Sequence, residues 1–235
     1  MIELKNVTKK YGQVWGIKDL SVQIEEGEFV YLVGPSGAGK TTFFKLLAAQ
    51  EQADSGSIRV GNIEVERLHR EQIYKLRRQL GIVLQRDLFF PRLTVKENLE
   101  TCLSALEVPQ EKWGLRIEQA LASVKMGQMT ERLPAQLSVG QQKKVALARA
   151  LLNQPPVVIA DEPTANLDVK SAKEMMQIFF RINQAGTTVL MATHDSTMVN
   201  SLRHRTLEIQ NSQLVRDDRQ GGYSRFADEK DVYVW

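Results

Sequence analysis

The sequence has one cysteine, Cys102, so no intrachain disulfide can form. Cys102 lies among apolar residues, as is typical of a small buried side chain and not of a reactive thiol. No apolar run approaches the roughly 18–20 residues that cross a bilayer, and residues 1–5 do not resemble a signal peptide. We therefore expect a cytoplasmic protein that reaches a membrane only through a partner.

A strong excess of one charge is also missing. The 235 residues include 31 basic and 28 acidic side chains, which give a net charge of +3. This balance argues against direct binding to nucleic acid or to a strongly anionic membrane surface. Hydrophobic residues make up 43% of the chain, as in a soluble globular protein with one large domain or one domain with an inserted subdomain.

The segment 34–41 fits the phosphate-loop pattern of glycine, four residues, glycine, lysine and then serine or threonine. Residues 28–33 before it predict a strand, and the apolar residues after it recur at helical spacing. A strand, a glycine-rich turn and a helix N-terminus together point backbone N–H groups at one place, which suits a polyphosphate better than a chance turn. The pattern therefore predicts a nucleoside triphosphate site, with Lys40 at the terminal phosphates and the Thr41 hydroxyl on Mg²⁺. The residues assigned to it are Gly34, Pro35, Ser36, Gly37, Ala38, Gly39, Lys40, Thr41 and Thr42.

Polar side chains follow two later strand patterns. Residues 157–160 form a short apolar run typical of a central parallel strand, and Asp161 and Glu162 come at its end. An acid at this position can reach Mg²⁺ held by Thr41, and the next acid can polarise an attacking water; an exposed acidic turn is the alternative. Residues 187–193 predict another buried strand, which ends at His194. Because ligands gather at the carboxyl ends of parallel strands, His194 is a site candidate as well as a possible structural histidine.

The other patterns predict the scaffold. Tyr11, after the first strand, could stack on an adenine ring or simply pack at a strand end. Asp168 is placed to cap a helix. The charged tail from residue 217 offers Val232, Tyr233 and Trp235 for docking. The predicted elements are strands over 2–7, 17–24 and 80–84, hairpins over 55–65 and 205–216 (the second turned at Asn211-Ser212), a helix over 70–78 and helical segments from about 86 to 150.

The segment Leu137-Ser138-Val139-Gly140-Gln141-Gln142 lies between the two halves of this site. Together with the phosphate loop, Gln85, Asp161-Glu162 and His194, it resembles the nucleotide-binding subunits of ABC transporters over residues 1 to about 216. The resemblance implies an α/β fold of the P-loop NTPase type, with a parallel central sheet, an N-terminal antiparallel β subdomain and a helical subdomain inserted at about 86–150. It also implies one ATPase domain over 1–216 and a tail over 217–235.

The resemblance further implies a homodimer in which two copies, head to tail, sandwich two ATP molecules. Ser138, Gly140 and Gln141 would then contact the γ-phosphate bound to the other copy. Ser138 is also placed to cap the helix that follows. Val139 departs from the pattern because the family usually has glycine there. Whether this valine weakens closure on ATP depends on whether the backbone needs a positive φ and on where the side chain points.

Roles within one copy follow from the same resemblance. Tyr11 would stack on adenine, and Asp161 would support Mg²⁺. Gln85 would contact Mg²⁺ and the attacking water and sense a membrane partner. Glu162 would be the general base of ATP hydrolysis, and His194 would hold the γ-phosphate.

Within the family, three segments look most like the FtsE type of cell-division ATPase: 76–81, 160–168 (with Ala165 where glycine is usual) and 188–195. Such proteins pair with the membrane protein FtsX and control peptidoglycan hydrolases, so an FtsX-like integral membrane subunit is the expected partner, and we expect the chain to lie peripherally on the cytoplasmic face of the cell membrane. Relatives in lipoprotein release and macrolide export are the alternative, and a soluble ATPase acting on nucleic acid or ribosomes is another. Phe89 and Phe90 would either line the groove for that partner or belong to the core, and we expect one of the two in the groove and the other buried.

Overall fold

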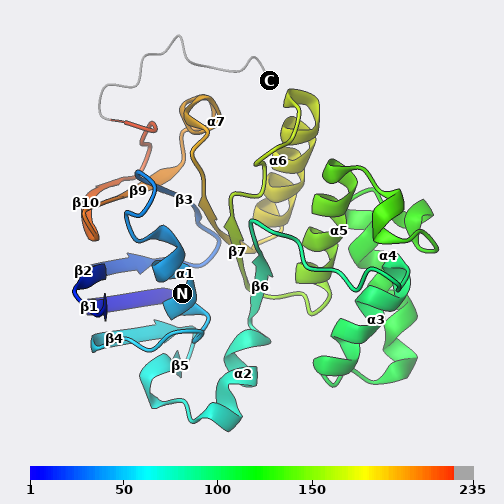
Figure 1. Cartoon of the computed structure of the whole chain (residues 1–235), viewed down its shortest axis with the longest axis horizontal. Helices are drawn as coiled ribbons and strands as arrows, with labels where there is room; N and C mark the ends of the chain where they lie inside the picture. The colour runs from blue at the N-terminus through cyan, green and yellow to red at the C-terminus, as the bar shows by residue number, and fades with distance from the viewer. Residues whose placement is uncertain (225–235) are drawn as a thin grey trace.

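The computed structural model describes residues 1–224, which form two β-sheets with helices around them (Figure 1). The smaller sheet is antiparallel and has the strand order β2-β1-β4-β5. Its strands are β1 Ile2–Tyr11, β2 Val14–Ile24, β4 Ser55–Val60 and β5 Ile63–Glu64. Each strand therefore reaches its neighbour through a hairpin or a longer connection, as antiparallel pairing allows.

The larger sheet has the strand order β10-β9-β3-β8-β7-β6. All neighbours are parallel except β9 and β10, which form a hairpin at one edge. The strands are β3 Phe29–Val33, β6 Leu80–Val83, β7 Val157–Asp161, β8 Thr188–Ala192, β9 Arg205–Gln210 and β10 Gln213–Asp218. The parallel arrangement brings the ends of β3, β7 and β8 to the same edge.

The central strands read as continuous apolar runs because both of their faces are buried. In β3, Tyr31 packs into the cluster shared with the helices, while Val30 and Leu32 pack into the cluster between the two sheets. In β7, Val158 likewise packs into the cluster shared with the helices, and Val157 packs into the cluster between the two sheets. Two separate cores therefore hold this sheet in place, and the strand ends that carry polar residues are fixed from both sides.

Helix α1 (Lys40–Leu47) belongs to the cluster between the sheets, to which it contributes Phe43, Phe44, Leu46 and Leu47. Figure 1 shows it between β3 and the antiparallel sheet. The sheets are also joined directly, because the Lys18 N–H donates to the Ser212 carbonyl at 2.7 Å. The position of α1 relative to β3 is thus set by packing on two sides.

The remaining helices cover the other face of the larger sheet or extend from it. Helices α3, α4 and α5 form a lobe of their own (Figure 1). The N-caps of α3, α5 and α6 are Thr94, Ser138 and Asp168, whose side chains each accept a backbone N–H bond. The bounds are α2 Ile73–Arg77, α3 Val95–Ala105, α4 Trp113–Ser123, α5 Val139–Leu151, α6 Val169–Gln184 and α7 Ser196–Ser201. Among the described residues, no helix combines the length and apolarity needed to cross a membrane.

The structure confirms the predicted fold class, with a parallel sheet beside an antiparallel one. It differs at Tyr11, which is the last residue of β1 and not part of the following connection, because it pairs with Val14 across the hairpin. Cys102 is half-buried against the helical core, where burial raises the pKa of its thiol. Val232, Tyr233 and Trp235 lie outside the described residues.

Candidate active site

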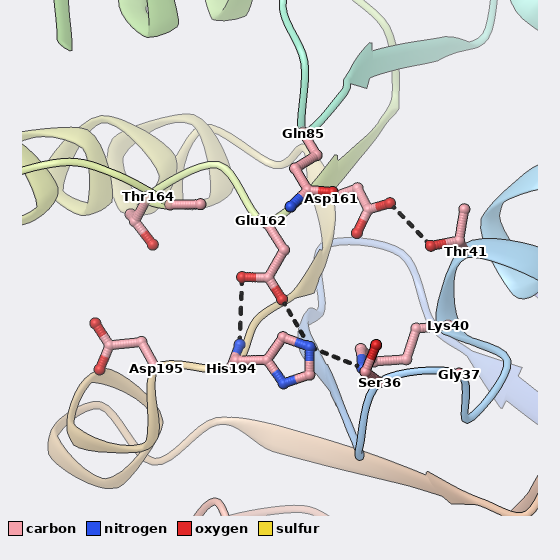
Figure 2. Close-up of a pocket in the computed structure, with 11 residues that line it drawn as sticks. Ser36, Gly37, Lys40, Thr41, Gln85, Asp161, Glu162, Thr164, His194 and Asp195 are labelled. Carbon is pink, nitrogen blue, oxygen red and sulfur yellow. Dashed lines mark hydrogen bonds and ion pairs between the residues drawn. The ribbon is translucent and has the colours of Figure 1, made fainter. Parts of the chain in front are cut away.

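The carboxyl ends of β3, β7 and β8 open into a pocket of about 500 Å³ (Figure 2). Its lining comes from the phosphate loop, from Gln85, the second residue after β6, and from the turns that follow β7 and β8. The structure therefore brings together residues that are up to about 160 positions apart in the chain. The lining residues are Ser36, Gly37, Lys40, Thr41, Gln85, Asp161, Glu162, Thr164, Ala165, His194 and Asp195.

The phosphate loop needs glycine where it passes closest to the backbone of other segments. Gly34 has φ 141°, and a Cβ there would lie 2.1 Å from the Ile209 carbonyl oxygen. Gly39, the residue before α1, has φ 117°, and a Cβ there would lie 2.3 Å from the Gly16 carbonyl oxygen. Any side chain at either position would clash with backbone, so the tight turn that points N–H groups into the pocket depends on both glycines.

Lys40 is the most deeply buried charge of the pocket, with 7% of its surface exposed. Its ammonium group donates to the carbonyls of Gly34 at 2.6 Å and Pro35 at 3.0 Å, and to Nε2 of His194 at 3.2 Å. Burial lowers the pKa of this group, whereas the nearby carboxylates of Glu162 and Asp161 act in the opposite direction. A buried cation at the end of the loop is placed to bind the terminal phosphates of a nucleotide.

The oxygen atoms at the other side of the pocket fit Mg²⁺. Thr41 Oγ1 donates to Asp161 Oδ2 at 3.2 Å, and Gln85 lines the same space. Burial raises the pKa of Asp161 despite that bond. No group of three or more His, Cys, Asp or Glu side chains within residues 1–224 is arranged to hold a metal. This sparse set of hard oxygen ligands suits Mg²⁺, which keeps waters and takes further ligands from nucleotide phosphates.

Glu162 has an unusual backbone, and one of its carboxylate oxygens makes no hydrogen bond, although it lies 3.5 Å from Nε2 of His194. Its φ of 50° lies in the left-handed region, which turns the chain sharply as β7 ends. Glu162 Oε2 accepts the His194 N–H at 3.3 Å, while Oε1 is buried and has no hydrogen-bond partner. Burial raises the pKa of Glu162, and the neighbouring Asp161 adds to the effect. A buried oxygen with no protein donor is available to accept a proton from a water in the pocket.

Several predicted residues lie outside this pocket. Tyr11 and Thr42 both lie beside Gly16, where a Cβ would come within 2.9 Å of each side chain. The segment Ser138, Gly140 and Gln141 begins α5, and none of the three lines the pocket. The other four residues of the phosphate loop, Gly34, Pro35, Ala38 and Gly39, form its turn. Conversely, the pocket includes Thr164 and Asp195, which sequence reasoning did not assign although both follow the ends of central strands.

Ser138 and Gln141 form a reciprocal cap at the start of α5. The Ser138 hydroxyl accepts the Gln141 N–H at 3.3 Å, and the Gln141 side chain accepts the Ser138 N–H at 2.9 Å. Val139 is the first residue of α5, its φ is not positive and its side chain is 54% exposed. Within one copy, valine in place of glycine therefore causes no backbone strain.

Comparison with known proteins places these features in a family. The ABC transporter family model matches residues 17–165. Two similar proteins are named cell division ATP-binding protein FtsE: one from Streptococcus pneumoniae D39, 40% identical over 95% of this chain and 97% of its own, and one from Mycobacterium tuberculosis H37Rv, 41% identical over 95% and 98%. The solved dimer of the ATP-binding cassette MJ0796 with ADP and Pi, a protein of Methanocaldococcus jannaschii, has 34% identity and a TM-score of 0.85 and covers 94% of this chain and 100% of its own. The chain belongs to the ABC transporter family.

Proposed function

We propose that this chain is the ATP-hydrolysing subunit of an FtsEX-like membrane complex that regulates peptidoglycan hydrolysis in cell division. The observation that carries the hydrolytic part is the buried Oε1 of Glu162, which has no hydrogen-bond partner and lies in a pocket that also contains Lys40 and His194. The sequence similarity to FtsE proteins along nearly the whole chain supports the cell-division part.

The reaction is attack of water on the γ-phosphate. Glu162 Oε1 accepts the proton of the attacking water, and Lys40 stabilises negative charge on the phosphates. When Mg²⁺ is bound by Thr41, Asp161 and Gln85, it neutralises charge on the phosphate oxygens. Catalysis in such a site consists mostly of positioning and charge stabilisation.

The site is completed by a second copy of the chain. Ser138, Gly140 and Gln141 lie outside the pocket, at an exposed helix N-terminus whose dipole favours an anion. In a head-to-tail homodimer this terminus covers the ATP bound to the other copy, and Tyr11, beside Gly16 and Thr42, stacks on its own copy's adenine. ATP binding closes the dimer, and hydrolysis reopens it.

The glutamate variant Glu162→Gln tests the catalytic base and the dimer together. We expect it to bind ATP without turnover and to run in Mg²⁺-ATP as a dimer of the 26.6 kDa chain in size-exclusion chromatography with light scattering. Wild-type protein in ADP serves as the monomer control. Normal ATP turnover by the variant would refute the assignment of Glu162 as base, and a monomer with bound ATP would refute the dimer.

The membrane partner is proposed to dock beside Gln85. Phe90 has 55% of its surface exposed, and the buried Asn98 fixes its backbone with bonds to both its N–H (2.8 Å) and its carbonyl (3.1 Å). Phe89 instead packs against the helical core, with the Arg149 guanidinium 5.1 Å from the centre of its ring. An exposed aromatic ring on a fixed backbone suits a short helix of an FtsX-like subunit.

Purification of the tagged chain from its native membranes, in detergent, tests that partner. Copurification of an integral membrane subunit with a large extracytoplasmic domain, together with a hydrolase or its adaptor, is the expected result and places the chain peripherally on the cytoplasmic face. Copurification of a lipoprotein carrier or an export pump would instead indicate the function of the lipoprotein-release or macrolide-export relatives. Recovery of ribosomes or nucleic acid without a membrane protein would contradict the membrane role.

A further inference from the structure

The segment after β10 turns back to the active site and contacts His194. The hydroxyl of Tyr223 lies 3.5 Å from Nδ1 of His194, on the side of the imidazole away from Lys40. The Tyr223 side chain is half-buried and packs against the helical core. No motif of the sequence indicates this contact, and nothing in the mechanism above uses it.

Hydrogen bonds to three elements hold the segment in place. The Tyr223 N–H donates to Oδ1 of the buried Asn200 in α7 at 2.7 Å. The Arg216 guanidinium in β10 donates to the Tyr223 carbonyl at 3.0 Å, and the Thr206 hydroxyl in β9 donates to the Gly221 carbonyl at 3.1 Å. The tyrosine hydroxyl is therefore set against His194 by backbone anchors on both sides of the contact.

The partners of Nε2 define the protonation of His194 in this arrangement. An ammonium group only donates, so Nε2, at 3.2 Å from the Lys40 ammonium, must accept (Figure 2). Burial and the Lys40 charge also lower the pKa of His194, which favours the neutral ring. The single ring proton is then on Nδ1 and points at the Tyr223 oxygen. Glu162 Oε1 lies 3.5 Å from the same nitrogen but makes no hydrogen bond to it.

A bound nucleotide requires the opposite tautomer. Phosphate oxygens accept hydrogen bonds, so His194 must present a proton on Nε2 to hold the γ-phosphate, while Lys40 turns to the phosphates. The ring then gains a proton on Nε2 and loses one from Nδ1 by exchange with solvent, with no net change in charge. A hydroxyl group suits both states because it can accept from Nδ1–H or donate to bare Nδ1.

We propose that Tyr223 is a positioning residue for ATP hydrolysis, which orients His194 through Nδ1 and supports the Nδ1–H tautomer without nucleotide and the Nε2–H tautomer with it. The segment after β10 is thereby coupled to the nucleotide state of the pocket. This inference rests on the proposed role of His194 at the γ-phosphate, whereas the tautomer of the nucleotide-free protein can be measured independently of that role.

The test compares the full-length wild type with Tyr223→Phe, which removes one oxygen and keeps the ring that packs against the core. The exposed Tyr74→Phe is the matched control. Nitrogen-15 NMR of the histidine rings reads the tautomer directly, and with three histidines in the chain a His194→Gln spectrum assigns the signal. We expect Nδ1–H in the nucleotide-free wild type, Nε2–H in the Glu162→Gln protein with Mg²⁺-ATP, and a smaller Nδ1–H population in nucleotide-free Tyr223→Phe.

Steady-state ATPase kinetics give the functional readout. We expect kcat of Tyr223→Phe to fall about three- to tenfold with KM for ATP within about twofold, because one hydrogen bond that orients a transition-state contact is lost. Tyr223→Leu, which also removes the ring, separates packing from the hydroxyl. A Tyr223→Phe enzyme equal to wild type beside an impaired Tyr223→Leu would overturn the proposal, as would an Nε2–H tautomer in the nucleotide-free wild type. A wild type without ATPase activity would instead refute the proposed function and leave the tautomer result standing.

Discussion

Asp161 and Glu162 are adjacent carboxylates whose surroundings give them different tasks. Asp161 Oδ2 accepts a hydrogen bond from Thr41, which keeps it beside the phosphate loop. Glu162, turned by its positive φ, faces His194 and keeps one oxygen free of hydrogen bonds. Two carboxylates at one strand end can thus serve a cation and a water separately, because their backbone directions differ. The strained residue is the proposed general base, and such outliers are often found at functional positions.

The acid stability of the protein depends in part on His204. This imidazole lies between aromatic rings, with centroids 4.8 Å from Phe29 and 5.3 Å from Phe180, and burial lowers its pKa. The unfolded chain therefore binds a proton at a higher pH than the folded one, so the contribution of neutral His204 is present above its unfolded pKa of about 6.5 and is lost as the pH falls through the folded pKa. We expect His204→Phe to flatten the fall in unfolding free energy between about pH 7 and pH 5, as measured by urea titration. If the unfolding free energy of His204→Phe falls with pH as steeply as that of wild type, His204 is not the group responsible.

Local sequence patterns predict the strands, the phosphate loop and the polar strand ends well, because each is encoded within about ten residues. They could not separate Phe89 from Phe90, since the exposure of each ring depends on its contacts with α3 and α5. They also missed Tyr223, whose place is fixed by Asn200 and Arg216 through tertiary hydrogen bonds. Local patterns also do not predict the proposed contacts of Ser138 with a second copy, because these contacts depend on how two copies associate; they follow from the family resemblance.

At the scale of elements, helix α5, whose N-terminus is capped by Ser138, also holds the loop that carries Gln85. The Lys143 ammonium donates to the Gln85 carbonyl at 2.7 Å and pairs with Asp87 at 3.2 Å, with side chains only 5% and 8% exposed. The other oxygen of Asp87 is buried without a hydrogen-bond partner, and burial raises the pKa of this carboxyl. The position of the Gln85 loop thus depends on a cation of the same helix that Ser138 caps.

Removing one partner of this pair leaves a buried charge without compensation. We expect Lys143→Met to lower the unfolding free energy by about 3 kcal/mol, and Lys143→Met with Asp87→Leu to recover most of the loss. The control Lys144→Met breaks the more exposed pair with Glu174 and should cost less than about 1 kcal/mol. Equal effects of the two lysine variants in chemical denaturation would refute the special role of Lys143.

The two phenylalanines after Gln85 belong to different environments. We expect Phe90→Ser to abolish stimulation of ATPase activity by the membrane subunit and to leave basal turnover and melting temperature unchanged, because its ring is exposed. Phe89→Ser should instead lower the melting temperature by several degrees, since it removes packing against the helical core. If the membrane subunit stimulates the ATPase activity of Phe90→Ser as strongly as that of wild type in reconstituted vesicles, the partner docks elsewhere.

At the scale of the whole molecule, the phosphate loop and the start of α5 lie on separate parts of the chain. The pocket is lined by the sheet ends and the phosphate loop, while Ser138 begins a helix of the α3–α5 lobe and does not line it (Figure 1). In the proposed dimer these are the two halves of one ATP site, and a single copy does not join them. Two copies placed head to tail would form two complete sites.

Mixing two inactive variants tests this arrangement most directly. Glu162→Gln lacks the base but keeps Ser138, and Ser138→Arg blocks the start of α5 but keeps Glu162. A mixed dimer contains one site with an intact Glu162 and an intact Ser138 from different copies. The account predicts that ATPase activity, close to zero for each variant alone, reappears on mixing and is greatest near equal amounts. Activity no higher than the sum of the separate variants, with both still able to bind ATP, would contradict a site shared between two copies.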